Sequence, residues 1–153
     1  MNLLKKIMLI EDDHITNYLN ERILKDYFKI DDILTFNSGD DAILYIMENK
    51  ECVNDLSLIL LDIHMSRLNG FEFLTIFSGL HDTHVDTKHI PVIMLSSSIM
   101  AEDREKSLQF NNVKSFFTKP LTLENLALFF KELCLLTPRD LEINASKNTQ
   151  SKS

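Results

Sequence analysis

The stretch Leu58-Ile59-Leu60-Leu61-Asp62 decides the fold, because a short apolar run ends there in a carboxylate. A second stretch near the N-terminus, Ile7-Met8-Leu9-Ile10-Glu11-Asp12-Asp13, repeats the pattern. Apolar runs of this length, bounded by polar residues, predict buried strands of a parallel sheet. In an open α/β sheet, functional groups gather at the carboxyl ends of the strands. We therefore expect the two acidic clusters to meet in one crevice.

Carboxylates that share a crevice repel each other. At a separation of about 4 Å and an effective dielectric constant of about 20, each pair costs roughly 4 kcal/mol unless a cation or a proton intervenes. Hard divalent cations such as Mg²⁺ prefer oxygen ligands of this kind. The sequence therefore predicts a Mg²⁺ site built around Asp62.

Apolar runs rich in β-forming residues alternate with amphipathic stretches along the chain, which predicts an α/β fold with a parallel sheet. We expect strands near residues 6–10, 33–36, 58–61, 92–95 and 115–118. We expect helices near residues 15–28, 42–47, 70–77, 102–110 and 122–133, with Ser38 and Thr122 as caps. One face of the first helix carries apolar residues at helical spacing, namely Ile15, Leu19, Ile23 and Tyr27.

Length and composition favour one globular domain. The 153 residues are 44% hydrophobic and 25% charged, enough for a single core. No apolar stretch reaches the length of a membrane span and no signal peptide is recognisable, so we expect a cytoplasmic protein with reduced Cys52 and Cys134. A net charge of −7 argues against nucleic acid as a direct partner. We assign residues 1–137 to the domain and expect the polar residues 138–153 to form a disordered tail.

Short motifs stand at strand ends in a fixed order. They are the acidic pair Glu11-Asp12, the run Asp62-Ile63-His64-Met65-Ser66-Arg67-Leu68-Asn69-Gly70, the hydroxyl residue Ser96, the aromatic Phe116 and the pair Lys119-Pro120. Together they resemble the receiver domain of two-component response regulators over about residues 5–136. That resemblance implies the flavodoxin-like (βα)5 fold, a doubly wound five-stranded parallel sheet with strand order 2-1-3-4-5.

The resemblance also implies roles for the residues at the strand ends. Asp62 is the expected phosphoacceptor, with Lys119 and Ser96 on the phosphoryl oxygens. Mg²⁺ is the expected cofactor, held by Asp12, Asp62, the backbone carbonyl of His64 and, through water, Glu11. Ser96 and Phe116 form the expected switch. The positions expected to be secondary to the site are Asp13, Ser97, Ser98 and Pro120.

The family implies a signalling phosphoacceptor, which catalyses only its own phosphotransfer and dephosphorylation, in place of a classical enzyme. The expected partners are a sensor histidine kinase or a histidine phosphotransfer protein, an unidentified downstream protein and, through the face of residues 102–110, 115–118 and 122–133, a second copy of the chain.

The sequence departs from the usual pattern of the family at two places. Ser66 replaces the usual proline, and the segment 78–89 is longer than usual, with His81, His84 and His89 interpreted as a polar surface loop.

Other interpretations of these residues remain open on the sequence alone. A pseudo-receiver would bind partners without phosphate. A Mg²⁺-dependent phosphohydrolase of the haloacid dehalogenase type would need its nucleophile in an Asp-x-Asp motif after the first strand, where this chain has Glu11-Asp12-Asp13. Asp13 could serve only as a helix cap, and Phe116 could be a static core residue.

Overall fold

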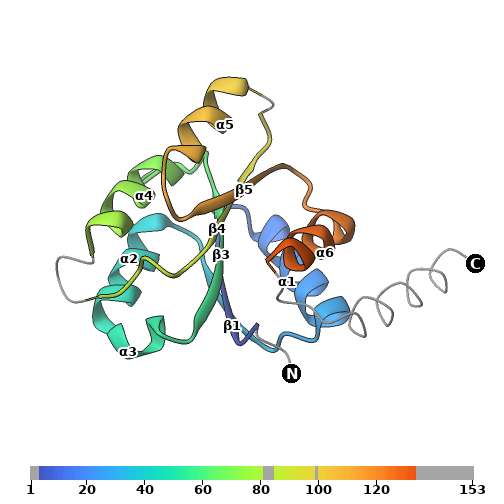
Figure 1. Cartoon of the computed structure of the whole chain (residues 1–153), viewed down its shortest axis with the longest axis horizontal. Coiled ribbons are helices and arrows are strands. Elements are labelled where there is room, and N and C mark those ends of the chain that lie inside the picture. The colour runs from blue at the N-terminus through green and yellow to red at the C-terminus, as the bar shows by residue number, and fades with distance from the viewer. Residues whose placement is uncertain (1–3, 81–84, 99, 134–153) are drawn as a thin grey trace, which may run out of the picture.

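A parallel sheet with strand order β2-β1-β3-β4-β5 organises the molecule (Figure 1). The structure is a computed structural model that describes residues 4–80, 85–98 and 100–133. The strands are β1 (Lys6–Ile10), β2 (Asp32–Phe36), β3 (Leu56–Asp62), β4 (Val92–Ser96) and β5 (Val113–Thr118). The helices are α1 (His14–Phe28), α2 (Gly39–Glu48), α3 (Lys50–Val53), α4 (Gly70–Gly79), α5 (Ala101–Leu108) and α6 (Leu123–Glu132). The predicted fold and strand order are confirmed, and the short α3 is an addition.

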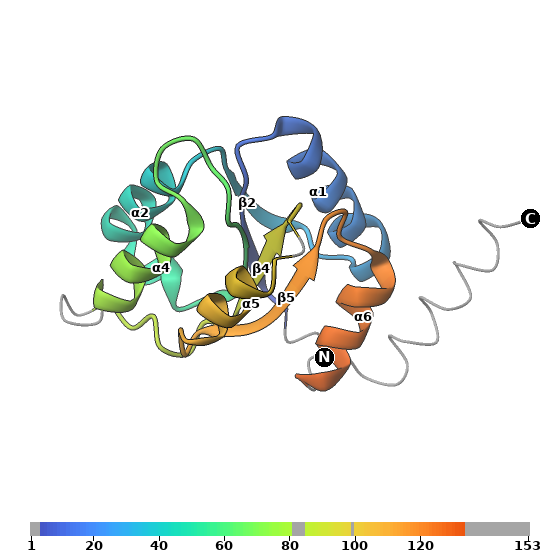
Figure 2. The ribbon, with the colours of Figure 1, turned by 90° about the horizontal axis from the view of Figure 1, so that it is seen from above.

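The central strands bury both of their faces, because helices cover the sheet on each side (Figure 2). Met8 and Ile10 face the core that α2 and α4 cover. The alternate residues Ile7 and Leu9 face the core beneath α1 and α6. Each central strand thus contributes to two cores, which is why its sequence is an uninterrupted apolar run.

The apolar face of α1 packs in its C-terminal half only, where Ile23 and Tyr27 are partly buried against the core. Ile15 is 71% exposed and Leu19 is 53% exposed, whereas the buried residues of the helix are Asn17, Asn20, Leu24 and Phe28. The first two residues of that face, Ile15 and Leu19, are therefore left on the surface. The helix is oriented by the C-terminal pair Leu24 and Phe28, which reach the core, and by the hydrogen bonds of Asn17 near its start.

Local sequence signals set the starts of the helices. The Ser38 side chain accepts a hydrogen bond from the Asp41 N–H at the start of α2, and Thr122 accepts from the Asn125 N–H at the start of α6. Both predicted caps are confirmed. Gly70 begins α4 so close to β3 that a Cβ there would lie 2.7 Å from the Asp62 carbonyl oxygen. Only glycine fits this approach.

The long connection between α4 and β4 is fixed where the structure describes it. Asn112 donates from its Nδ2 to the carbonyls of Thr87 and Ile90, both at 2.8 Å. Exposed His89 lies 3.6 Å from Asp86. His81 and His84, Cys134 and the predicted tail lie outside the described residues, and the domain limit at residue 137 stays a prediction. None of the helices in the described part of the chain is both long and apolar enough to span a lipid bilayer.

Candidate functional site

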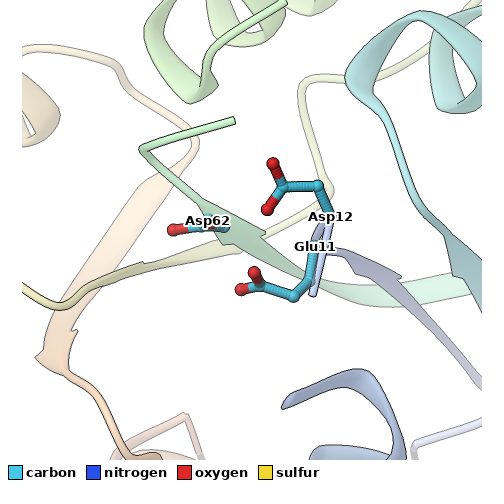
Figure 3. Close-up of side chains that lie close together, drawn as sticks. All are labelled: Glu11, Asp12 and Asp62. Atoms are coloured by element: carbon cyan, nitrogen blue, oxygen red, sulfur yellow. The ribbon is translucent and has the colours of Figure 1, made fainter. Parts of the chain in front are cut away.

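Three carboxylates meet at the carboxyl ends of β1 and β3. The strands are neighbours in the sheet, with Ile10 opposite Leu61, so Glu11 and Asp62 emerge side by side. Each of Glu11, Asp12 and Asp62 offers an oxygen, and these oxygens all lie within 4.8 Å of one another (Figure 3). Glu11 and Asp62 are buried and Asp12 is exposed. The predicted meeting of the acids is therefore confirmed, and Asp12 is its exposed member.

Lys119 reaches the same acids from the loop after β5. Its Nζ lies 2.5 Å from Glu11 Oε2 and 3.0 Å from Asp62 Oδ1. The Lys119 N–H donates to the Ser96 carbonyl at 2.8 Å, which ties this loop to the end of β4. Three carboxylates and one ammonium leave two negative charges when all four groups are ionised. That surplus matches the charge of one divalent cation.

The buried charges shift one another's pKa values. Burial raises the pKa of Glu11 to about 7, and the charge of Asp62 adds to the effect, while the hydrogen bond from Lys119 opposes it. Burial alone would lower the pKa of Lys119, but its bonds to Glu11 and Asp62 outweigh that and raise it. Lys119 therefore stays cationic, whereas Glu11 takes up a proton near neutral pH.

The loop between β3 and α4 supplies backbone N–H donors to two of the acids. The His64 N–H lies 3.3 Å from Asp62 Oδ1, and the Ser66 N–H lies 3.3 Å from Asp12 Oδ2. A proline has no N–H and could not make the second bond. Ser66, in the place of the family's usual proline, therefore gives this chain a donor that helps to orient Asp12.

Ser96 closes β4 and is fully buried. Its Oγ accepts from the Ser98 N–H at 3.0 Å, and Ser98 Oγ accepts from the Met100 N–H at 3.3 Å. Ser97 is exposed. Phe116 is partly buried and packs against the core on the α4 side of the sheet. Its ring does not join the carboxylate cluster, so its place as a switch stays a prediction.

The Asp13 carboxylate caps α1, while the Asp13 N–H donates to Glu11 Oε1 at 3.2 Å. The Asp13 carboxylate accepts from the N–H groups of Ile15 and Thr16. The hydrogen bond from Ile15, and then that from Thr16, lower the pKa of Asp13. A role as helix cap therefore accounts for the geometry of Asp13. Pro120 lies beside Lys119 and lines a groove against α1.

Two residues near the site escaped the sequence analysis. Buried Asn17 donates from its Nδ2 to the Glu11 carbonyl at 2.7 Å and so holds the end of β1. Asp103 Oδ2, in the first turn of α5, lies 3.4 Å from His64 Nε2. The spacing of Asn17, Asn20, Leu24 and Phe28 is helical, and could have identified Asn17 as inward-facing. No sequence signal pairs Asp103 with His64, because their contact is purely tertiary.

The response regulator receiver domain family matches residues 7–130. This chain belongs to that family. The match covers most of the 153-residue chain and agrees with the strand order and with the acidic cluster described above.

Two relatives show how similar this chain is to individual proteins: one is a curated protein and the other is a solved structure. The heme response regulator HssR of Staphylococcus epidermidis is 28% identical over 144 residues, which cover 94% of this chain and 55% of that protein. This chain thus spans about half the length of that relative. A two component response regulator from Cytophaga hutchinsonii is 28% identical with a TM-score of 0.75, over 86% of this chain and 97% of that one.

A further solved structure is the receiver domain of the histidine kinase CKI1 from Arabidopsis thaliana, complexed with Mg²⁺. It is 18% identical, with a TM-score of 0.71, and the match covers 84% of this chain and 88% of that one. At this identity the likeness shows the fold alone.

Proposed function

We propose that this receiver domain accepts a phosphoryl group on Asp62 from a phosphohistidine of a sensor kinase or a phosphotransfer protein. The observation that carries the proposal is the contact of 3.0 Å between Asp62 Oδ1 and Lys119 Nζ inside a buried cluster of acids. A buried carboxylate with a fixed cation beside it can act as a nucleophile toward phosphorus, since the ammonium offsets charge as the phosphoryl oxygens arrive.

The donor set of the site fits Mg²⁺. Carboxylate oxygens of Asp12 and Asp62, the backbone carbonyl of His64 and, through water, Glu11 would hold the ion. The all-oxygen composition and the two surplus negative charges support this choice over softer metals. The Mg²⁺ complex of the CKI1 receiver is consistent with it. When bound, the ion supplies charge neutralisation for the acids and for the phosphoryl oxygens.

Three side chains of the protein have separate roles in the proposed phosphoryl transfer. An Asp62 carboxylate oxygen forms a bond to phosphorus while the bond between phosphorus and the donor's imidazole nitrogen breaks, and the imidazole leaves with the electron pair. Lys119 pairs with one phosphoryl oxygen, and the Ser96 hydroxyl turns to donate to another. The phosphoryl group of the product carries about 1.5 to 2 negative charges at neutral pH in place of the single charge of the Asp62 carboxylate, and this change is the signal.

An apolar surface beside Lys119 supports a protein as phosphodonor. A groove of about 490 Å³ runs between α1 and the segment from Lys119 to Leu121. Leu19 lines it at 53% exposure, and Ile15 stands exposed on the same helix. Exposed apolar patches on soluble proteins commonly mark interaction sites. We therefore assign the exposed part of the apolar face of α1, Ile15 and Leu19, to docking of the donor, which would deliver its phosphohistidine to the adjoining acids.

Phosphorylation with a small donor tests the function without the cognate kinase. Acetyl phosphate and Mg²⁺ are added to the full chain, and intact mass spectrometry counts the phosphoryl groups. We expect one group on the wild type, none on Asp62→Asn, and one on the control Asp55→Asn, which alters an exposed acid just before β3. A wild type that takes up no phosphoryl group and shows no NMR response to beryllofluoride with Mg²⁺ would instead support the pseudo-receiver.

A further inference from the structure

Helix α5 is the least anchored of the longer helices that flank the sheet. Among its eight described residues, only Ser107 is buried. Met100 occupies its N-cap position, where a methionine side chain cannot accept from the free N–H groups of the first turn. Helices with little apolar burial derive little stability from packing and open readily. The position of α5 therefore depends on a few specific contacts.

One contact comes from the loop that carries Asp62. The backbone of His64 donates to Asp62 Oδ1, while the His64 imidazole lies 3.4 Å from Asp103 in the first turn of α5. The same residue thus touches the phosphoacceptor with its main chain and α5 with its side chain. Any movement of the Asp62 carboxylate reaches α5 through one residue.

A second connection comes from β4. Ser96 Oγ accepts from Ser98, Ser98 Oγ accepts from Met100, and the Met100 carbonyl accepts from the Asp103 N–H at 3.2 Å. Both connections end on Asp103. Further along the helix, Lys106 Nζ lies 4.4 Å from the centre of the Phe71 ring, which links α5 to α4.

We propose that the contact between His64 and Asp103 is a latch that holds the first turn of α5 against the loop after β3 until Asp62 is phosphorylated. The proposal rests on the function proposed above. A phosphoryl group on Asp62 adds negative charge beside the latch, which repels the Asp103 carboxylate. The Ser96 hydroxyl turns toward the phosphoryl group at the same time, which weakens the second connection. With both connections loosened, α5 is released while α4 stays in place.

Hydrogen exchange of the unphosphorylated chain tests the latch directly. We expect His64→Gln and Asp103→Asn each to raise the exchange rates of the α5 amides roughly two- to fivefold, since partly exposed pairs of this kind contribute little more than that. The double variant should exchange no faster than either single variant, because both changes remove one contact. The matched control is Glu102→Gln, which removes the same charge from an exposed neighbour on the same helix.

Unchanged exchange in both single variants, additive effects in the double variant, or an equal rise in Glu102→Gln would each overturn the latch. Beryllofluoride with Mg²⁺ then tests its coupling to the site. We expect this phosphoryl mimic to speed α5 exchange in the wild type and to add little in Asp103→Asn; an equal increment in both would also overturn it.

The two proposals fail in distinguishable ways. A chain that accepts phosphate on Asp62 but shows no variant effect on α5 retains the function and loses the latch. A chain that accepts neither phosphate nor beryllofluoride loses the function, whatever the exchange rates show.

Discussion

Helices α4 and α5 follow successive strands on the same side of the sheet, yet they are held in different ways (Figure 2). α4 begins with a reciprocal capping box between Asn69 and Glu72 and buries Phe73, Leu74 and Phe77. α5 has no such cap and buries only Ser107 among its described residues. The difference teaches that one helix is held by its apolar core and its cap, whereas its neighbour is held mainly by polar contacts. Packing makes α4 part of the scaffold, and the latch proposed above would make α5 depend on the state of the site.

The largest test of this difference compares one apolar truncation in each helix. Phe73→Ala removes a fully buried ring from α4, and we expect it to lower the free energy of unfolding by about 3–5 kcal/mol. Leu108→Ala removes a side chain that is 51% exposed from α5, and we expect a loss under about 1 kcal/mol. Urea unfolding measures both. Similar losses in the two variants would show that α5 is packed as firmly as α4.

Alanine substitutions at two glycines of α4 test whether this helix is part of the scaffold. A Cβ at Gly70 would meet the Asp62 carbonyl oxygen at 2.7 Å and Ile63 Cα at 2.9 Å, both backbone atoms that cannot move cheaply. We expect Gly70→Ala to cost about 1–3 kcal/mol and to displace Asp62. Gly79→Ala meets nothing within 4 Å and should be neutral or slightly stabilising. Thermal unfolding, with phosphorylation by acetyl phosphate as the second readout, compares them. Normal phosphorylation of Gly70→Ala would contradict the close fit.

Magnesium affinity should depend on pH through Glu11. Because the folded-state pKa of Glu11 is raised to about 7, the folded protein holds a proton there between about pH 4.5 and pH 7 that the unfolded chain has lost. This group's contribution to stability therefore falls as the pH rises through that window. Mg²⁺ must displace the proton, so its affinity should fall up to about tenfold per pH unit below 7.

Titrations followed by NMR at pH 8 and pH 6 measure that dependence. Glu11→Gln should flatten it. The shift changes should lie at residues 11–13 and 62–70, on the side that α4 anchors. Large changes along α5 with Mg²⁺ alone would contradict its control by the phosphoryl group.

A smaller effect is expected at Ser66, in the loop that leads into α4. Ser66→Pro removes the N–H that Asp12 accepts and should weaken Mg²⁺ binding roughly threefold to tenfold. Ser66→Ala keeps that N–H and should bind as the wild type does. Isothermal titration with Mg²⁺ compares the two. Equal affinities in both variants would show that the backbone donor does not orient Asp12.

The smallest effect comes from giving α5 the cap that it lacks. The Met100 backbone is extended, as an N-cap requires, so Met100→Ser should stabilise α5 by about 1 kcal/mol and slow its amide exchange. Met47→Ser, at an exposed methionine in α2, is the control and should leave α5 unchanged. Slower exchange in α5 with the control alone would contradict a capping effect.

The sequence by itself determined the sheet and the meeting of the acids. The apolar runs Ile7–Ile10 and Leu58–Leu61 predicted buried strands of a parallel sheet, and the ends of these strands bring Glu11, Asp12 and Asp62 together. Caps at Ser38 and Thr122 were equally local, since a cap depends on residues a few positions apart.

Only the tertiary structure decided which side of α1 faces the core, how Ser66 orients Asp12 and that His64 meets Asp103. The physical reason is distance along the chain. Periodicity and capping report on neighbours, whereas a contact between residues 54 positions apart, as for Asp12 and Ser66, exists only after packing has set the loops. The apolar face of α1 follows the same reason, because its helical period is visible in the sequence but the surface that it meets is not.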